Sequence, residues 1–323
     1  MSQQVTTDQE PGIFLMSRDA NISANVSFIP VQCTIFLSCL YSIIFVFSLP
    51  MNIVVLWAMW PQVITSLGVP VYAVSLLCAV LLEIITLPFG VAYMLGRLPL
   101  SSMSCLIISL IPTIAQRVAV TFVVWIFVVR YVAVVHPLGY GRLCKGWICS
   151  LTSISIWLLL ICISLVQPMT SELKTEQCFP TYQVVTELAL FDLITTFVFG
   201  LFPLVLLGTI CILIFCALRN SPTVCIKQRR RINTLLLLVV FGFGFLCCPM
   251  NLVRAYQCIL VLLGQPPNKV NNGFLLTYQL LFALSSLSVV LTPLFYAFSS
   301  SEVKKKLWEL FAKNKPMDVP TNT

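Results

Sequence analysis

The stretch SCLIISLIPTIAQRVAVTFVVWIFVVRYVAVV, residues 104–135, is almost wholly apolar, and its only charged side chains are Arg117 and Arg130. A helix needs about 20 apolar residues to cross a hydrocarbon core of about 30 Å. Inside lipid, every backbone N–H and C=O must be bonded within its own segment, so a crossing run of this kind has to be helical. The stretch is therefore predicted to be a transmembrane helix.

Six further apolar runs of similar length lie on either side of this stretch. They cover residues 34–59, 69–95, 148–168, 185–218, 232–261 and 273–298. Hydrophobic residues make up 59% of the 323 residues and charged residues only 9%, whereas a soluble domain carries about 25% charged residues. We therefore expect an all-α membrane protein, a seven-transmembrane helix bundle over residues 34–298, with no room for a second folded domain.

The distribution of basic residues predicts the orientation of this bundle. Of the 19 Lys and Arg residues, 13 fall on one side of the predicted membrane and four on the other. The side rich in Lys and Arg is cytoplasmic. The tail 1–33 is then extracellular, and the segment 299–323 lies in the cytoplasm. We interpret the net charge of +8 as topology and attraction to membrane lipids, and not as nucleic-acid binding.

The extracellular side carries the residues expected to be modified. Two Asn-x-Ser sequons place glycosylation at Asn21 and Asn25. Of the 14 cysteines, Cys105 and Cys178 stand apart at the outer side, where an oxidising exterior permits a disulfide. For Cys33 and Cys258 two alternatives stay open, a second disulfide or two free thiols at helix ends. No Cys or His spacing indicates a metal site, and no cofactor is expected.

Short motifs in every run carry a family resemblance. They are Leu49-Pro50-Met51-Asn52, Leu87-Pro88-Phe89, Cys105, Arg130-Tyr131, Trp157, Phe202-Pro203, Phe243 with Pro249, and Thr292-Pro293-Leu294-Phe295-Tyr296. In this order and at these spacings, the chain resembles the rhodopsin-like (class A) G-protein-coupled receptors. Leu87-Pro88-Phe89 and Arg254 favour the branch of nucleotide, protease-activated and lipid receptors.

The resemblance implies a plasma-membrane receptor that passes an extracellular signal to a heterotrimeric G protein. The residues that it assigns to coupling are Arg130, Tyr131, Pro137, Leu138, Arg230 and Tyr296. It also implies a short eighth helix along the membrane surface, for which the amphipathic stretch 302–311 is the candidate.

Several positions depart from the family pattern, and all of them concern the switch between resting and active states. Val129 replaces the acid that normally restrains Arg130. Val80 and Ala119 replace polar ligands of the family's sodium pocket, and neither side chain offers an oxygen. Glu83 lies on the same helical face as Val80, where it either replaces the lost acid in part or sits protonated in a polar gap. We therefore expect a receptor that is either constitutively active or poor at coupling.

Ionisable residues inside the bundle are the candidates for ligand binding, because a charge in mid-membrane is costly and normally faces the interior. Two arrangements are open for Arg117: an ion pair with Asp192, or joint binding of an acidic ligand with Arg254. Arginine suits such a ligand because it holds carboxylate or phosphate with two hydrogen bonds. The full set of ligand-site candidates is Arg117, Arg254, Gln116, Asn251, Asp192 and Tyr278.

Two other functions remain as alternatives to a signalling receptor. The lost switch residues fit a receptor-like protein that acts as a decoy or modulator without signalling. A transporter is disfavoured, because the sequence shows no inverted repeat with paired broken segments. Nothing in the sequence indicates an enzyme: it holds no nucleophile–base constellation and no phosphate-binding loop.

Overall fold

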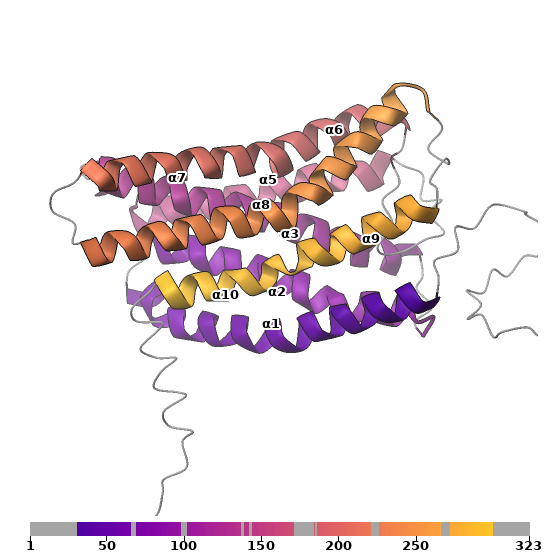
Figure 1. Ribbon diagram of the computed structural model, residues 1–323, viewed down its shortest axis with the longest axis horizontal. Helices are drawn as coiled ribbons and strands as arrows, with labels where there is room; N and C mark the ends of the chain where they lie inside the picture. Colours follow the sequence, from indigo (N-terminus) through magenta and orange to yellow (C-terminus); the bar gives the residue numbers. More distant parts are fainter. Residues whose placement is uncertain are drawn as a thin grey trace, which may run out of the picture.

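The computed structural model describes residues 31–65, 69–97, 102–136, 139–141, 144–170, 184, 186–220, 226–265 and 272–299. These residues form a bundle of helices that run side by side along its long axis (Figure 1). Within this part of the chain, seven helical spans are long and apolar enough to cross a membrane. The predicted all-α seven-transmembrane bundle is confirmed.

The first four spans are uninterrupted helices. They are α1 (Val31–Thr65), α2 (Val69–Met94), α3 (Ser102–Val135) and α5 (Gly146–Thr170). Their ends differ by a few residues from the apolar runs, and α1 begins three residues before residue 34 and ends six after residue 59. The reason is that an apolar run marks the part of a helix in lipid, whereas the hydrogen-bonded backbone continues past it.

The fifth span is composite, so the prediction of one helix over 185–218 is wrong in this detail. A 3-10 turn, η1 (Thr186–Leu188), leads into α6 (Ala189–Thr196), a π-helical segment η2 (Phe197–Leu201) and α7 (Phe202–Asn220). In η2 the N–H of Phe202 donates to the carbonyl of Phe197, five residues back. Pro203 follows at once, and because proline has no N–H and its ring crowds the preceding turn, regular α-helical bonding fails there.

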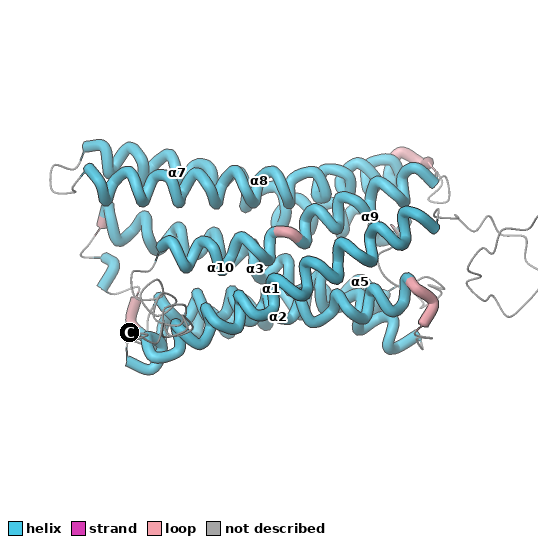
Figure 2. Tube along the Cα trace, turned by 60° about the horizontal axis from the view of Figure 1, so that its bottom comes forward, coloured by secondary structure: helices cyan, strands magenta, loops and turns pink. Residues whose placement is uncertain are grey.

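The sixth span is the long helix α8 (Ile226–Leu262), and the seventh is divided into α9 (Asn272–Ser286) and α10 (Ser288–Ser299). The single helix expected over 273–298 is therefore corrected to two. At the break, the N–H of Leu287 donates to the carbonyl of Leu284, and that of Val290 donates to the carbonyl of Leu287, each at 3.1 Å. This three-residue spacing is tighter than that of an α-helix, and Figure 2 shows a short loop segment in pink between α9 and α10.

A proline in α10 explains one contact that joins the two ends of the chain. Pro293 has no N–H to give to the carbonyl of Val289, four residues before it. The side chain of Asn52 in α1 replaces that donor: its Nδ2 lies 3.2 Å from the Val289 oxygen and 2.9 Å from the Ser48 oxygen. Asn52 is fully buried, so the bond satisfies a carbonyl that water does not reach.

The core is shared by all seven spans, is dominated by aromatic and aliphatic side chains, and includes a cluster of large residues where α2 meets α3. Tyr72, Phe122 and Phe127 are almost completely buried. The ring of Tyr72 stands edge-on to Trp125 at a centroid distance of 6.2 Å. Aromatic pairs favour this edge-to-face geometry. The contact packs the second half of α3 against α2.

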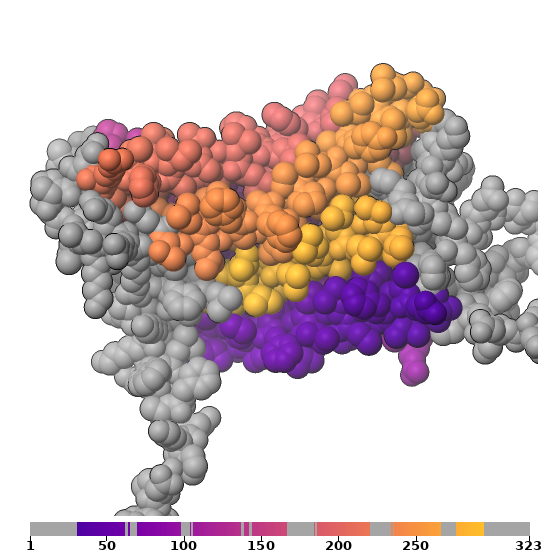
Figure 3. All heavy atoms as spheres, viewed as in Figure 1, coloured from indigo at the N-terminus to yellow at the C-terminus, as the bar shows by residue number. Residues whose placement is uncertain are grey.

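The outer surface of the bundle is apolar, as lipid contact requires. Figure 3 shows α9 and α10 in yellow between α1 in indigo and α8 in orange. On α8, Phe241 and Phe245 are 70% and 71% exposed, while Phe243 between them is buried. Phe241 and Phe245 therefore face lipid, and Phe243 packs inside the bundle.

We expect Asn52→Ala to lower the thermal stability of the protein in detergent. The substitution leaves the Val289 carbonyl without its donor, and interhelical hydrogen bonds in membranes are worth about 0.6 to 1.7 kcal/mol. The measurement is the melting temperature of the purified protein. Ser42→Ala is the matched control, because the Ser42 hydroxyl donates to the Ser38 carbonyl within its own helix. Equal melting of the two variants would contradict the role given to Asn52.

Candidate functional site

Consecutive spans alternate in direction, so α1, α3 and α9 all begin at one end of the bundle. This is the α3 N-terminal end, which lies on the right in Figure 1. In the half of the bundle towards it, polar side chains from α3, α8 and α9 meet. Gln116 Nε2 donates to Ser285 Oγ, and the Ser285 hydroxyl faces Cys247 Sγ at 3.9 Å. This chain of contacts ties α3, α9 and α8 together at one level.

Arg254 lies on α8 two turns beyond Cys247 and is buried, with 9% of its surface exposed. Its Nη2 donates to the hydroxyl of Tyr278 on α9 at 3.1 Å. Tyr278 is itself 3% exposed. A buried guanidinium is costly unless polar groups surround it, and the phenol supplies one of them while fixing the direction of the charge.

Asn251 stands one turn before Arg254 on the same helix and makes an unusually close contact with η2. Its Nδ2 donates to the Cys247 carbonyl at 2.8 Å. A Cβ placed on Gly200 would lie 2.3 Å from Asn251 Oδ1. Only glycine therefore fits at the buried position 200 while Asn251 keeps this orientation.

The two arginines of the predicted ligand site have partners on different helices. Arg117 follows Gln116 on α3, but its Nη1 donates to Ser164 Oγ on α5 at 3.1 Å, whereas Arg254 bonds to α9. Asp192 is buried at 2% exposure on α6, and α6 packs mainly against α8. The ion pair between Arg117 and Asp192 stays a prediction.

At the opposite end of α3, Arg130 is half-buried beside an aromatic residue of the connection to α5. Burial raises the pKa of the Tyr140 phenol, the Cys144 thiol adds to that rise, and the Arg130 guanidinium lowers it. Arg130 therefore lies close enough to Tyr140 to lower the pKa of its phenol. Val129 is buried in the core at 6% exposure, so an apolar contact occupies the place where the family carries an acid.

Several predicted residues lie outside the described residues. These are Pro137, Leu138, Cys178, Asn21, Asn25 and the stretch 302–311, together with the side chains of Cys105, Arg230 and Tyr296. Cys33 and Cys258 are described, and no disulfide joins them. The first of the two alternatives for that pair, a second disulfide, is therefore not formed in the structure.

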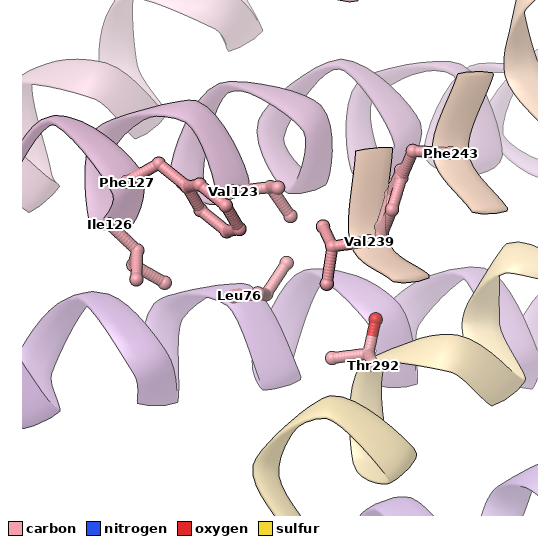
Figure 4. A pocket seen from close by; sticks show the side chains of 7 residues that line it. All are labelled: Leu76, Val123, Ile126, Phe127, Val239, Phe243 and Thr292. Carbon is pink, nitrogen blue, oxygen red and sulfur yellow. The ribbon is translucent and has the colours of Figure 1, made fainter. Parts of the chain in front are cut away.

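Between the mid-bundle contacts and the Arg130 end lies a small apolar cavity (Figure 4). Residues of α2, α3, α8 and α10 line it, and all of them are apolar except one threonine. They are Leu76, Val123, Ile126, Phe127, Val239, Phe243 and Thr292. The Thr292 hydroxyl has no hydrogen-bond partner among the residues that the structure describes.

The positions where the family's sodium ligands would lie are apolar and packed. Val80 and Ala119 are 2% and 6% exposed and belong to the core. Glu83 is buried at 4% exposure on α2. Among the described residues, no group of three or more His, Cys, Asp or Glu is placed to hold a metal ion.

Comparison with known families decides the class of the protein. The family described as 7 transmembrane receptor (rhodopsin family) matches residues 51–296, which is most of the chain. The chain belongs to this receptor family. The receptor is therefore a multi-pass membrane protein, and the resemblance found in the sequence is confirmed.

Individual relatives cover the receptor over most of its length at low identity. CX3C chemokine receptor 1 of Bos taurus is 26% identical over 289 residues, covering 87% of this chain and 78% of the relative. G-protein coupled receptor 65 of Homo sapiens is 24% identical over 287 residues, covering 84% of each chain. G-protein coupled receptor homolog US28 of Human cytomegalovirus (strain AD169) is 26% identical over 283 residues, covering 85% of this chain and 76% of the relative. The predicted branch of nucleotide, protease-activated and lipid receptors stays a prediction.

The sequence pointed to six ligand-site residues, and the structure joins some of them through residues that were not predicted. Ser164 and Ser285 are the hydrogen-bond partners of Arg117 and Gln116. The sequence did contain a signal for Ser285, because three serines (Ser285, Ser286 and Ser288) lie close together in the seventh span. Such a group of hydroxyls indicates polar contacts inside the bundle. Gly200 gave no such signal, because its role depends on what faces it.

We expect Gly200→Ala to destabilise the receptor. The new methyl group forces Asn251 out of place and breaks its bond to the Cys247 carbonyl, and overpacking of this kind costs about 1–3 kcal/mol. The melting temperature measures the effect. Gly208→Ala in the same span is the control, because its Cβ would meet nothing within 4 Å.

A second substitution tests whether the clash is with Asn251. In a chain that already carries Asn251→Ala, the added Gly200→Ala change should cost much less. An equal loss of stability in both backgrounds would show that the close contact with Asn251 is not the cause.

Proposed function

We propose that this protein is a cell-surface receptor that passes an extracellular signal to heterotrimeric G proteins. The observation that carries the proposal is Arg130-Tyr131 at the C-terminal end of α3, in a chain matched by the rhodopsin-family receptors over residues 51–296. In that family this arginine belongs to the surface that couples to the G protein. Arg130 is half-buried at that end of the bundle, beside Tyr140.

The basic residues support an orientation with the N-terminus outside. The excess of Lys and Arg lies on the same side as the Arg130 end of α3, and such residues are retained in the cytoplasm. The α3 N-terminal end, with Arg254 and Tyr278, is then the extracellular half. Glycosylation at Asn21 and Asn25 and a disulfide between Cys105 and Cys178 belong to this orientation.

The resting state of the receptor is weakly restrained. Val129 cannot hold Arg130 by charge, and Val80 and Ala119 offer no oxygen to a cation. Because a two-state equilibrium is set by the difference in free energy between its states, the loss of contacts made only at rest shifts it towards the active state. We therefore propose that the receptor signals without ligand.

The chemistry of the extracellular half favours an acidic ligand. Arg254 is buried, held in direction by Tyr278, and followed inward by the polar side chains of Asn251 and Gln116. A carboxylate or phosphate group entering between α3, α8 and α9 would meet this guanidinium first. An acidic lipid or a nucleotide-like molecule fits this description.

We expect basal G-protein activation in cells that express the receptor without added ligand. Arg130→Ala should reduce this activity to background, because it removes the cation of the coupling surface. The measurement is G-protein activation at matched surface expression. Val129→Asp supplies the missing partner of Arg130 and should lower the basal signal without abolishing it.

Silence of the wild-type receptor at good surface expression would contradict the proposed basal activity. If the panel of ligands described next also fails to activate it, the alternative of a decoy or modulator that does not signal is favoured. The observation behind that alternative is the burial of Val129, Val80 and Ala119 in the apolar core.

We expect Arg254→Ala to weaken the response to an acidic ligand by about 30-fold or more, because loss of one partner in a buried charge contact costs about 2–5 kcal/mol. The measurement is the half-maximal concentration in a panel of acidic lipids and nucleotides. Arg254→Lys keeps the charge but cannot make two parallel hydrogen bonds, so its potency should lie between those of the wild type and Arg254→Ala. A ligand whose potency is unchanged by Arg254→Ala would remove Arg254 from the binding site.

A further inference from the structure

Two glycines lie close together in the middle of α8, and the structure gives them different surroundings. Gly242 and Gly244 each cost a helix interior about 1 kcal/mol relative to alanine. A Cβ on Gly242 would lie 2.6 Å from Leu291 Cδ1 of α10, whereas a Cβ on Gly244 would meet nothing within 4 Å. Gly242 therefore forms a notch in the surface of α8, and the end of the Leu291 side chain sits in it.

The notch brings α8 and α10 together in the half of the bundle that holds Arg130. In membranes, where lipid is as apolar as leucine, close approach at small residues is a main source of helix association. Leu291 is partly buried and packs against the core. Its methyl group is held on one side by this packing and on the other by the backbone of α8.

A small cavity lies in the seam beside the notch. Val239 and Phe243 on α8 line the apolar cavity, and so does Thr292, the residue next to Leu291 on α10 (Figure 4). A void removes contacts that its lining atoms would otherwise make. Thr292 also makes no hydrogen bond to any described residue, so its hydroxyl does not tie α10 to α8.

We propose that the seating of Leu291 in the Gly242 notch holds this half of α8 against α10 and thereby keeps the receptor at rest. The tight contact and the cavity lie side by side, so a methyl group at position 242 pushes α8 away from α10 at a level where the packing already contains a gap. This proposal rests on the proposed signalling function for its consequence, but the packing contact is measured independently of signalling.

The test compares Gly242→Ala with the matched control Gly244→Ala in the full-length receptor in lipid nanodiscs. We expect the amides of residues 236–243 to exchange hydrogen about tenfold faster in Gly242→Ala than in the control, as overpacking opens the seam. Basal G-protein activation should rise in the same variant. Adding Leu291→Val to Gly242→Ala shortens the side chain that meets the new methyl group and should reverse both changes.

The outcomes separate the two proposals. Equal exchange in Gly242→Ala and Gly244→Ala would overturn the notch as a restraint. Faster exchange that Leu291→Val reverses, without any change in signalling in a receptor that does signal, would overturn its role in the resting state. Faster exchange in a receptor that is silent in every variant supports the packing contact and contradicts the proposed coupling to G proteins instead.

Discussion

Lipid offers the backbone no hydrogen-bond partner, and the helices of this receptor are arranged around that constraint. Where the α-helical pattern fails, another group takes over. The carbonyl of Val289 loses its donor to Pro293 and receives the side chain of Asn52 from α1 instead. The backbone of η2 is satisfied within its own span, where the N–H of Phe202 donates to the carbonyl of Phe197. One side of η2 faces lipid through Phe197 and Val198, and its buried Gly200 faces Asn251 of α8.

Polar side chains follow the same constraint and gather between helices. Gln116, Ser285 and Cys247 join three helices at one level, and Arg254 with Tyr278 joins two of them closer to the α3 N-terminal end. Hydrogen bonds of this kind fix the relative positions of α3, α8 and α9. A ligand that replaced one of these partners would act on all three helices at once.

The other half of the bundle combines a few polar contacts, such as that of Asn52 with the Val289 carbonyl, with extensive apolar packing. Val80, Ala119 and Val129 are buried where relatives in the family carry polar or acidic residues. Between α8 and α10, the Leu291 side chain fills the space that Gly242 leaves, and a cavity lies beside this contact. Contacts of this kind are short-ranged, so a change of one methyl group is sufficient to alter them. In the resting state that we propose, this packing contact is the restraint that remains where the family's charge-based one is lost.

The sequence by itself determined the membrane class, the seven spans and the family. Length and hydropathy are enough for the spans, because a helix in lipid needs only about 20 apolar residues. It also predicted that Arg254 and Gln116 lie inside the bundle, because a polar group in lipid is costly. It missed the π-helical segment of the fifth span and the division of the seventh at Leu287, because apolar composition gives the length of a span and not its local pattern of backbone hydrogen bonds.

Only the tertiary structure decided which residues meet. Adjacent residues Gln116 and Arg117 bond to different helices, and Gly242 contacts Leu291 while Gly244 faces open space. Neither difference is visible in the sequence, because spacing along one helix says which residues share a face but not which helix that face meets. The orientation and packing of the seven spans around a common core determine which helix each face meets. They therefore determine which glycine contacts a neighbouring side chain and which partner each arginine binds.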